Sequence, residues 1–418
     1  MGKAVITGMG PVTVLGTGKS GFEAALFSQQ MPKWQVTDQG VGGYLIADTD
    51  IENAWARLKQ DYPELKMPKH VDKVTEISLL ASLLALEDAR LIESMESLKV
   101  TSKQADRWAV TYGSALSGFS QAEAGHEQYL EAKKSGGRYR AKPSVSLELL
   151  HVTPSAQVAM LLGITGQATA HANSCAAGHT ALIEAQRLIE LGLADVVIAG
   201  STECPMAPYT ADALTSLKVV SPKQLMQPCT QDRDGFVFAE GSAFFIVESE
   251  SHALARGAHI YAKIAGNAMG NEAAHMTQPR DEGVSVAAIM TKALRAADIW
   301  ETQVDACVLH ASATPQNDKN EALAMARVFE ESGHQPLTVA LKARFGHSLG
   351  SASAIQVAAI LLMMQRNESP YLGLKQDLDE SLELSICPQG AKLPMKVVVS
   401  NAFGFGGINT SMIFTAFD

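Results

Sequence analysis

Strand-like and helix-like segments alternate along this chain, and this alternation limits the folds open to it more than any other feature. The apolar runs 196–199 and 307–309 have the length of buried strands, whereas 176–193 and 352–364 have the length of helices. The alternation predicts layered α/β units in which helices cover the faces of a sheet.

Length and charge narrow the class of protein further. The 418 residues exceed one typical domain, so we expect two α/β halves, residues 1–255 and 256–418. A net charge of −10 argues against a nucleic-acid-binding protein. The chain starts with a short strand and a Gly-rich turn, and its apolar runs are too short to cross a membrane, so we expect no membrane contact and a cytoplasmic location.

Five cysteines are scattered along the chain, at positions 175, 204, 229, 307 and 387. Their number is odd and no two have the spacing of a metal-binding pair, so a disulfide framework or a metal site is not expected. The segment NSCAAGH around Cys175 lies between a strand-like segment and a helix of small residues. A thiol at a helix N-terminus ionises more easily, which predicts a nucleophile, although a buried structural cysteine is the alternative.

Two histidines stand in settings that suit chemistry. His310 ends a strand and opens the small, hydroxyl-rich loop ASATP, and His347 precedes a helix of small residues in KARFGHSLG. Either could be a core residue, but a thiolate that accepts an acyl group needs neutral hydrogen-bond donors for the charge that develops elsewhere. Lys342 could tune His347 or lie on the surface. His179 is expected to face away from Cys175 along its helix.

Two polar stretches, 121–143 and 221–233, lack clear periodicity, and we expect both to form surface excursions or lids.

Together the motifs resemble those of the elongating β-ketoacyl-acyl-carrier-protein synthases. They are the cysteine segment, HASATP at 310–315, Lys342 with Gly346-His347, and NAFGFGGIN at 401–409, and the resemblance spans essentially the whole chain. It implies the thiolase-like fold, with two duplicated α/β halves in five α-β-α-β-α layers, and a dimer formed through the sheet edges.

The resemblance also implies a decarboxylative Claisen condensation. Cys175 would accept an acyl chain from an acyl carrier protein, and His310 and His347, with Lys342 nearby, would assist decarboxylation of a malonyl thioester. The backbone N–H groups of Cys175 and Phe405 would form an oxyanion hole, with Phe405 as the gate to the acyl pocket. The activity is that of an acyltransferase that extends a fatty-acid or polyketide chain by two carbons without a cofactor of its own.

Further residues match binding positions of that family. Ser312, Thr314 and Phe403 would contact the phosphopantetheine arm and its substrate, and Leu116 would limit chain length at the dimer interface. Basic residues in two regions would dock the acidic carrier protein, unless they form a solvated face: Lys66, Lys69, Lys73 and Lys218.

Three departures from the family pattern separate this chain from the housekeeping enzymes. Ala311 stands where glycine is usual, Phe345 is expected to narrow part of the site, and Gln356 falls where a carboxylate commonly pairs with the lysine that matches Lys342. They favour a specialised polyketide or polyene ketosynthase, either a homodimer or a heterodimer with a chain-length partner. The alternatives are a subunit that only shapes a partner's pocket and a thiolase-like acyltransferase, although the latter normally has a second cysteine in the loop at 401–409.

Overall fold

The computed structural model of the protein describes residues 3–68, 71–92, 98–139, 142–279, 281–374 and 377–417. Within that part, one continuous sheet runs in the order β11-β10-β12-β13-β9-β1-β8-β7-β5-β6, and the short β2 (Gly16–Thr17) pairs with β1. Its two halves meet only where β1 pairs with β9, at Val5 with Lys263 and Ile6 with Ala262.

The same strand order occurs in both halves of the sheet. The first half consists, in spatial order, of β1 (Ala4–Thr13), β8 (Gly241–Ser249), β7 (Val196–Glu203), β5 (Trp108–Gly113) and β6 (Ala168–His171). The pairs β1–β8 and β8–β7 are antiparallel, and the pairs β7–β5 and β5–β6 are parallel. The second half repeats this order along β9 (Ala262–Asn271), β13 (Ile408–Thr415), β12 (Val397–Gly404), β10 (Ala306–Val308) and β11 (Leu337–Val339). The repetition supports an ancient duplication, and we propose that the halves divide at residues 255 and 256.

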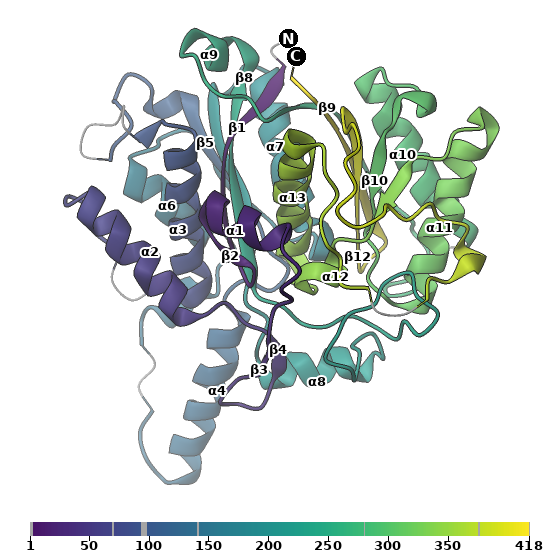
Figure 1. Cartoon of the computed structure of the whole chain (residues 1–418). Helices are drawn as coiled ribbons and strands as arrows, with labels where there is room; N and C mark the ends of the chain where they lie inside the picture. The colour runs from purple at the N-terminus through teal and green to yellow at the C-terminus, as the bar shows by residue number, and fades with distance from the viewer. Residues whose placement is uncertain are drawn as a thin grey trace.

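Helices complete five layers, and this confirms the predicted α-β-α-β-α arrangement (Figure 1). The middle layer consists of α7 (Ala177–Glu190) and α13 (Ala352–Arg366), which pack against each other and against strands of both halves. The outer layers are formed on one side by α3 (Lys73–Asp88) and α6 (Thr153–Leu162), and on the other by α10 (Val284–Ala297) and α11 (Pro315–Phe329).

The sequence of the middle layer explains its burial. Every residue of α13 from Ala352 to Met364 is buried, as expected for a helix that is apolar all round. The window Leu349–Arg366 is long and apolar enough to cross a membrane, but 89% of it is buried inside the protein, so the core accounts for its composition. Gly178 permits the close crossing with α7, because a Cβ there would lie 2.7 Å from the backbone nitrogen of Ala354.

Of the two stretches expected to be surface excursions or lids, the first lies on the surface as predicted and the second does not. Residues 119–134 form a regular helix, α4 (Phe119–Lys134), which has no buried residue and projects from the body at the bottom of Figure 1. In the stretch 221–233, residues 226–230 are buried, so this segment is part of the packed structure rather than a lid.

The remaining elements are α1 (Gly18–Leu26), β3 (Trp34–Val36), β4 (Gly42–Tyr44), α2 (Asp48–Asp61), α5 (Val145–Glu148), α8 (Pro208–Ser216), α9 (Glu250–Ala255) and α12 (Lys342–Phe345).

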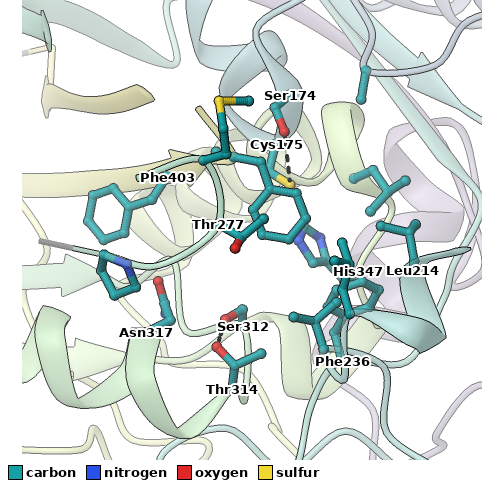
Figure 2. A pocket seen from close by; sticks show the side chains of 18 of the residues that line it. Ser174, Cys175, Leu214, Phe236, Thr277, Ser312, Thr314, Asn317, His347 and Phe403 are labelled. Atoms are coloured by element: carbon teal, nitrogen blue, oxygen red, sulfur yellow. Dashed lines mark hydrogen bonds between the residues drawn. The ribbon is translucent and has the colours of Figure 1, made fainter. Parts of the chain in front are cut away.

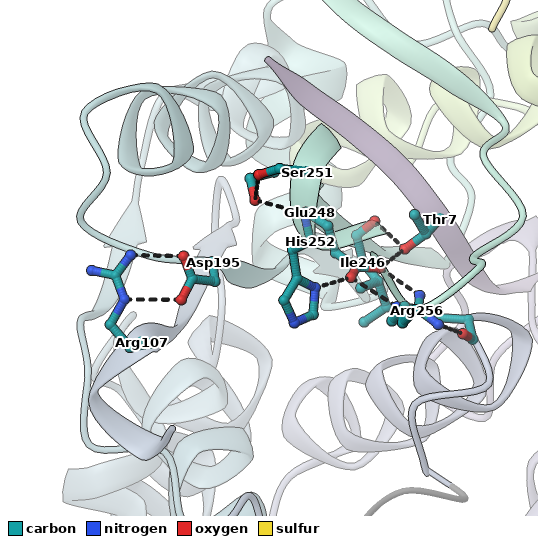
Figure 3. Close-up of polar contacts among 10 residues, drawn as sticks. Thr7, Arg107, Asp195, Ile246, Glu248, Ser251, His252 and Arg256 are labelled. Carbon is teal, nitrogen blue, oxygen red and sulfur yellow. Dashed lines mark hydrogen bonds and ion pairs between the residues drawn. The ribbon is translucent and has the colours of Figure 1, made fainter. Parts of the chain in front are cut away.

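A buried polar cluster fixes the end of the first half (Figure 3). The carboxylate of Glu248, at the end of β8, is fully buried and lies 2.5 Å from both Arg256 and His252. It also accepts a hydrogen bond from the hydroxyl of Thr7 in β1. A buried carboxylate needs such partners, so this cluster ties α9 and the chain that follows it to the two strands beneath.

Candidate active site

Cys175 lies at the start of the middle-layer helix α7, as the sequence predicts. The turn before it contains Ser174 in a left-handed conformation with φ 49°, which is uncommon for a residue other than glycine. This sharp turn places the half-buried Cys175 at the wall of a large cavity (Figure 2). Strained backbone of this kind is often found at functional sites.

The thiol is less acidic than its position at a helix start suggested. Burial raises the pKa of Cys175 to about 11, although the Ser174 hydroxyl, 3.9 Å from the sulfur, and the charge of Lys342 act in the opposite direction. The expected easy ionisation is therefore not met, and the resting thiol is protonated at neutral pH. The cost of desolvating a thiolate exceeds the stabilisation from the Ser174 hydroxyl and the Lys342 charge.

His310 and His347 lie together in the same cavity. Their ring centroids are 5.6 Å apart and their planes cross at 80°. Burial, with a smaller contribution from the charge of Lys342, holds the pKa of both imidazoles well below the usual 6.5. Both rings are therefore neutral at physiological pH, and each carries a single N–H group.

The surroundings of His310 fix which ring nitrogen carries its proton. The backbone N–H of Phe403 donates to Nδ1 at 3.2 Å, so Nδ1 accepts and Nε2 carries the hydrogen. The ammonium group of Lys342, itself fully buried, lies 3.5 Å from the same Nδ1 and donates to the backbone carbonyl of His310. Lys342 thus supports the ring from behind rather than lining the cavity.

Glu321 is a functional residue that the sequence analysis missed. Its buried carboxylate accepts the backbone N–H groups of His310 at 2.8 Å and Ala311 at 2.9 Å. Its charge also opposes the lowering of the Lys342 pKa that burial causes. The signal in the sequence was the pair Asp318 and Glu321, which opens the helix directly after the His310 loop.

Gln356 does not stand beside Lys342, so the predicted pairing position was wrong. Its side-chain amide in α13 donates to the hydroxyl of Ser400 at 2.9 Å and to the backbone carbonyl of Asn401 at 3.0 Å. His179 agrees with the prediction that it faces away from Cys175, because it does not line the cavity and is fully buried, hydrogen-bonded to the same Ser400. Phe345 is buried in the main apolar core and does not line the cavity, so it narrows nothing there.

The turn of the β12–β13 hairpin closes the cavity beside Cys175. This turn, which we call the Phe405 loop, comprises residues 404–408 and contains Gly406 with φ 88° and Gly407 with φ 73°. A Cβ on Gly404 would lie 3.0 Å from the Cβ of Ser174, so glycine lets the loop backbone pack against the cysteine turn. Phe403 and Phe405 both line the cavity.

The cavity has a volume of about 790 Å³, which is within the range for small-molecule sites. Leu116 lines one wall, and the hydroxyl groups of Ser312 and Thr314 line another while bonding each other at 2.9 Å. The exposed Lys218 also lines the cavity. Several lining residues were not foreseen, among them residues 275–279, Leu214 of α8 and Phe236, whose ring meets His347 edge-on with centroids 4.9 Å apart.

The remaining predicted docking residues lie elsewhere. Lys66 is exposed and does not line the cavity, and Lys69 lies outside the described residues. Lys73 forms an ion pair with the buried Glu240 at 2.9 Å, so it is engaged within the fold rather than free for a partner. Among the described residues, no group of three or more His, Cys, Asp or Glu side chains could hold a metal ion.

Comparison with known proteins agrees with this geometry. The model of the N-terminal domain of β-ketoacyl synthases matches residues 2–253, and the model of their C-terminal domain matches residues 261–372. The chain belongs to the β-ketoacyl synthase family. It is therefore an acyltransferase of the β-ketoacyl synthase type, as the sequence motifs implied.

Named relatives of this synthase come from both fatty-acid and polyketide systems. It is 30% identical to a 3-oxoacyl-[acyl-carrier-protein] synthase 2 of Vibrio harveyi, over 99% of this chain and 98% of the relative. It is also 30% identical to a putative polyketide β-ketoacyl synthase 1 of Streptomyces cyaneus, with the same coverage of 99% and 98%. A type II polyketide ketosynthase solved with its acyl carrier protein and bound to the hexaketide aligns over 100% of both chains, with 27% identity and a TM-score of 0.84.

Proposed function

We propose that this synthase joins a Cys175-bound acyl chain to a two-carbon unit from a malonyl group on an acyl carrier protein. The observation that carries the proposal is the meeting of one thiol and two neutral imidazoles at a single apolar-walled cavity. An acyl-accepting nucleophile and uncharged hydrogen-bond donors are what a decarboxylative condensation requires. The related synthases act in fatty-acid and polyketide systems, so the product is an extended chain of one of these classes.

In the first step, the sulfur of Cys175 attacks the carbonyl carbon of an acyl thioester. A new carbon–sulfur bond forms, the bond to the carrier sulfur breaks, and the thiol proton leaves with the carrier as its free thiol. At a pKa of about 11 the resting thiol is protonated, so this proton must be lost for the sulfur to attack. The backbone N–H groups of Cys175 and Phe405 hold the oxyanion, since Gly404 packs against the cysteine turn.

In the second step, the malonyl group loses carbon dioxide and negative charge develops on its thioester oxygen. The Nε2–H group of His310 and the N–H group of His347 donate hydrogen bonds to that oxygen without giving up a proton. The enolate carbon then attacks the acyl carbonyl on Cys175. A carbon–carbon bond forms, the cysteine sulfur leaves, and it recovers one proton from solvent.

The cavity walls position the two substrates. Ser312 and Thr314 bind the phosphopantetheine arm through their hydroxyl groups, Phe403 contacts the arm, and Leu116 limits the acyl chain. Lys218, exposed where it lines the cavity, contacts the acidic carrier protein, with Lys66 as an outlying contact. A second ketosynthase-like chain, identical or related, completes the dimer. We place the enzyme in the cytoplasm and assign it no cofactor of its own.

Replacing Cys175 by Ala tests whether the thiol is needed for condensation while the two imidazoles alone support decarboxylation. We expect condensation to fall below detection while malonyl decarboxylation continues, since the histidine pair remains. His310→Ala should give the opposite pattern, with the Cys175 acyl adduct still formed and decarboxylation reduced by about 100-fold or more. Product analysis and carbon dioxide release measure the two steps, and condensation by Cys175→Ala would refute the proposal.

A further inference from the structure

His179 is a buried histidine with partners on both strands of the hairpin that carries Phe405. It follows Cys175 by four residues on α7 and has no exposed surface. Its Nδ1 lies 3.0 Å from the hydroxyl of Thr410 in β13, and its Nε2 lies 2.9 Å from the hydroxyl of Ser400 in β12. A single side chain of the cysteine helix therefore contacts both strands beneath the Phe405 loop.

The hydrogen bonds around His179 have only one consistent direction. The Thr410 hydroxyl already donates to the carbonyl of Ala402 at 3.0 Å, so it must accept a hydrogen bond from Nδ1–H of His179. Nε2 then accepts from the Ser400 hydroxyl, and Ser400 accepts from the Gln356 amide at 2.9 Å. The chain runs from Gln356 through Ser400, His179 and Thr410 to Ala402, and no donor in it lacks an acceptor.

This chain of hydrogen bonds ends at the base of the Phe405 loop. Ala402 and Thr410 face each other in the β12–β13 register, and they are buried, whereas residues 403–408 are half-buried. Burial of the imidazole, reinforced by the charge of Lys342, lowers the pKa of His179 to about 3. The ring stays neutral at any working pH, so the proton order does not change.

We propose that His179 is a positioning residue. It fixes the position of the Phe405 loop, and so of the Phe405 backbone N–H, relative to Cys175. This inference rests on the proposed function, in which N–H groups of Cys175 and Phe405 together hold the acyl oxyanion. The helix α7 begins two residues after Cys175, and its residue His179 bonds both strands of the Phe405 hairpin. The backbone N–H groups of Cys175 and Phe405 are therefore held at a fixed distance from each other, although they lie 230 residues apart in sequence, from 175 to 405.

Acylation of Cys175 depends on the relative position of these two N–H donors more than malonyl decarboxylation does. Glu321 and Lys342, which hold the backbone of His310, lie outside the hairpin, and the hairpin contributes one bond, from the backbone N–H of Phe403 to Nδ1. Loss of the His179 bonds therefore loosens the loop while leaving the main supports of His310 in place. A displacement of a catalytic donor by about 1 Å can slow a reaction by about 100-fold.

The test compares His179→Leu with His179→Gln in single-turnover acylation by an acyl-carrier-protein thioester. Leucine has neither donor nor acceptor, whereas the glutamine amide offers one of each. We expect His179→Leu to slow acylation by about 10- to 100-fold, with malonyl decarboxylation within about threefold of wild type. His179→Gln should restore most of the acylation rate. His252→Leu, which removes a histidine bonded to Glu248, is the matched control and should leave both rates unchanged.

Thr410→Val keeps the inference testable if His179→Leu does not fold, because valine keeps the shape of threonine without its hydroxyl. Slowed acylation with retained decarboxylation in that variant supports the inference. Equal rates to wild type, or a parallel loss of both steps in every variant, would overturn it. Absence of any Cys175 adduct in the wild-type enzyme would instead refute the proposed function itself.

Discussion

Burial decides the charge state of the reacting residues in this synthase. The thiol of Cys175 is protonated at rest because burial raises its pKa to about 11, and both cavity histidines are neutral because burial lowers theirs. The buried Lys342 lies behind them, and the charge of Glu321 opposes the lowering of its pKa. Charge therefore develops at the reacting atoms only when a substrate is present, where fixed donors can stabilise it.

The raised pKa predicts how Cys175 reacts with an alkylating agent. Between pH 7 and pH 10, the rate of labelling by iodoacetamide should increase by about tenfold per pH unit, because only the thiolate reacts and its fraction grows in that proportion. Mass spectrometry of the labelled peptide gives the rate, and Cys175→Ala gives the background. A rate that is already constant from pH 7 would contradict the raised pKa, because the thiol would then be ionised at that pH.

The neutral state of His179 predicts a pH-dependent contribution to stability. In the unfolded chain His179 binds a proton below about pH 6.5, whereas in the folded protein its pKa is about 3. Its stabilising effect is complete above pH 6.5 and is lost as the pH falls. Relative to His179→Gln, the wild type should lose about 1.4 kcal/mol between pH 7.5 and pH 5.5. Urea unfolding of both proteins measures this, and a constant difference would contradict it.

At the scale of elements, the crossing of α7 and α13 positions the site. Cys175 precedes α7 and His347 precedes α13, so the packing of these helices sets the relation between thiol and imidazole. The crossing is close because Gly178 presents no side chain to Ala354 and Ser353. Any side chain at that position forces the helices apart.

Gly178→Ala should therefore destabilise the protein and disturb catalysis together. The new Cβ would lie 2.7 Å from a backbone atom of α13, and such overpacking costs about 1–3 kcal/mol. Gly125→Ala, in the projecting α4, is the matched control, since its Cβ would meet only atoms 3.8 Å away or more. That variant should be about 0.5–1 kcal/mol more stable than wild type. Equal unfolding free energies for the two variants, from denaturant titration, would refute the packing argument.

The sequence predicted the elements better than the directions in which side chains point. Alternating patterns gave the α/β layers, and local context gave Cys175, His310 and His347. The helix at 119–134 was not predicted, because α4 buries no residue and its sequence therefore has no apolar stripe that would indicate a helix. Gln356 was misplaced because its partners, Ser400 and Asn401, come from a distant strand, and Phe345 because the core claims it. Lys73 was misplaced because its partner Glu240 lies 167 residues away.

At the scale of the whole molecule, the strand β6 forms the outer edge of the sheet in the first half. Within the described residues β6 pairs only with β5, and exposed strand edges readily join a second chain. The helix α6 that packs against β6 exposes 61% of Met160, and the segment before it exposes 50% of Leu150. This face suits a dimer of the kind implied by the family resemblance.

Charges on this face should dissociate the dimer. We expect the wild type to have a mass in solution of about 89 kDa, twice the 44.5 kDa of the chain, and the double variant Leu150→Asp, Met160→Asp to have that of one chain. Leu254→Asp, on the distant α9, is the control and should remain a dimer, although Leu254 is 56% exposed. Light scattering gives the masses. A monomeric wild type would contradict self-association and direct the search to a different partner chain.

The central claim is that Cys175 carries the growing acyl chain in the cavity that also holds His310 and His347. The most direct measurement is mass spectrometry of the enzyme after mixing with an acyl-carrier-protein thioester, followed by peptide mapping. We expect one acyl group per chain, located on Cys175, present in Cys204→Ala and absent in Cys175→Ala. We also expect that adding malonyl-carrier protein removes the group as an extended product. An acyl group on any other residue, or none at all, would contradict the account.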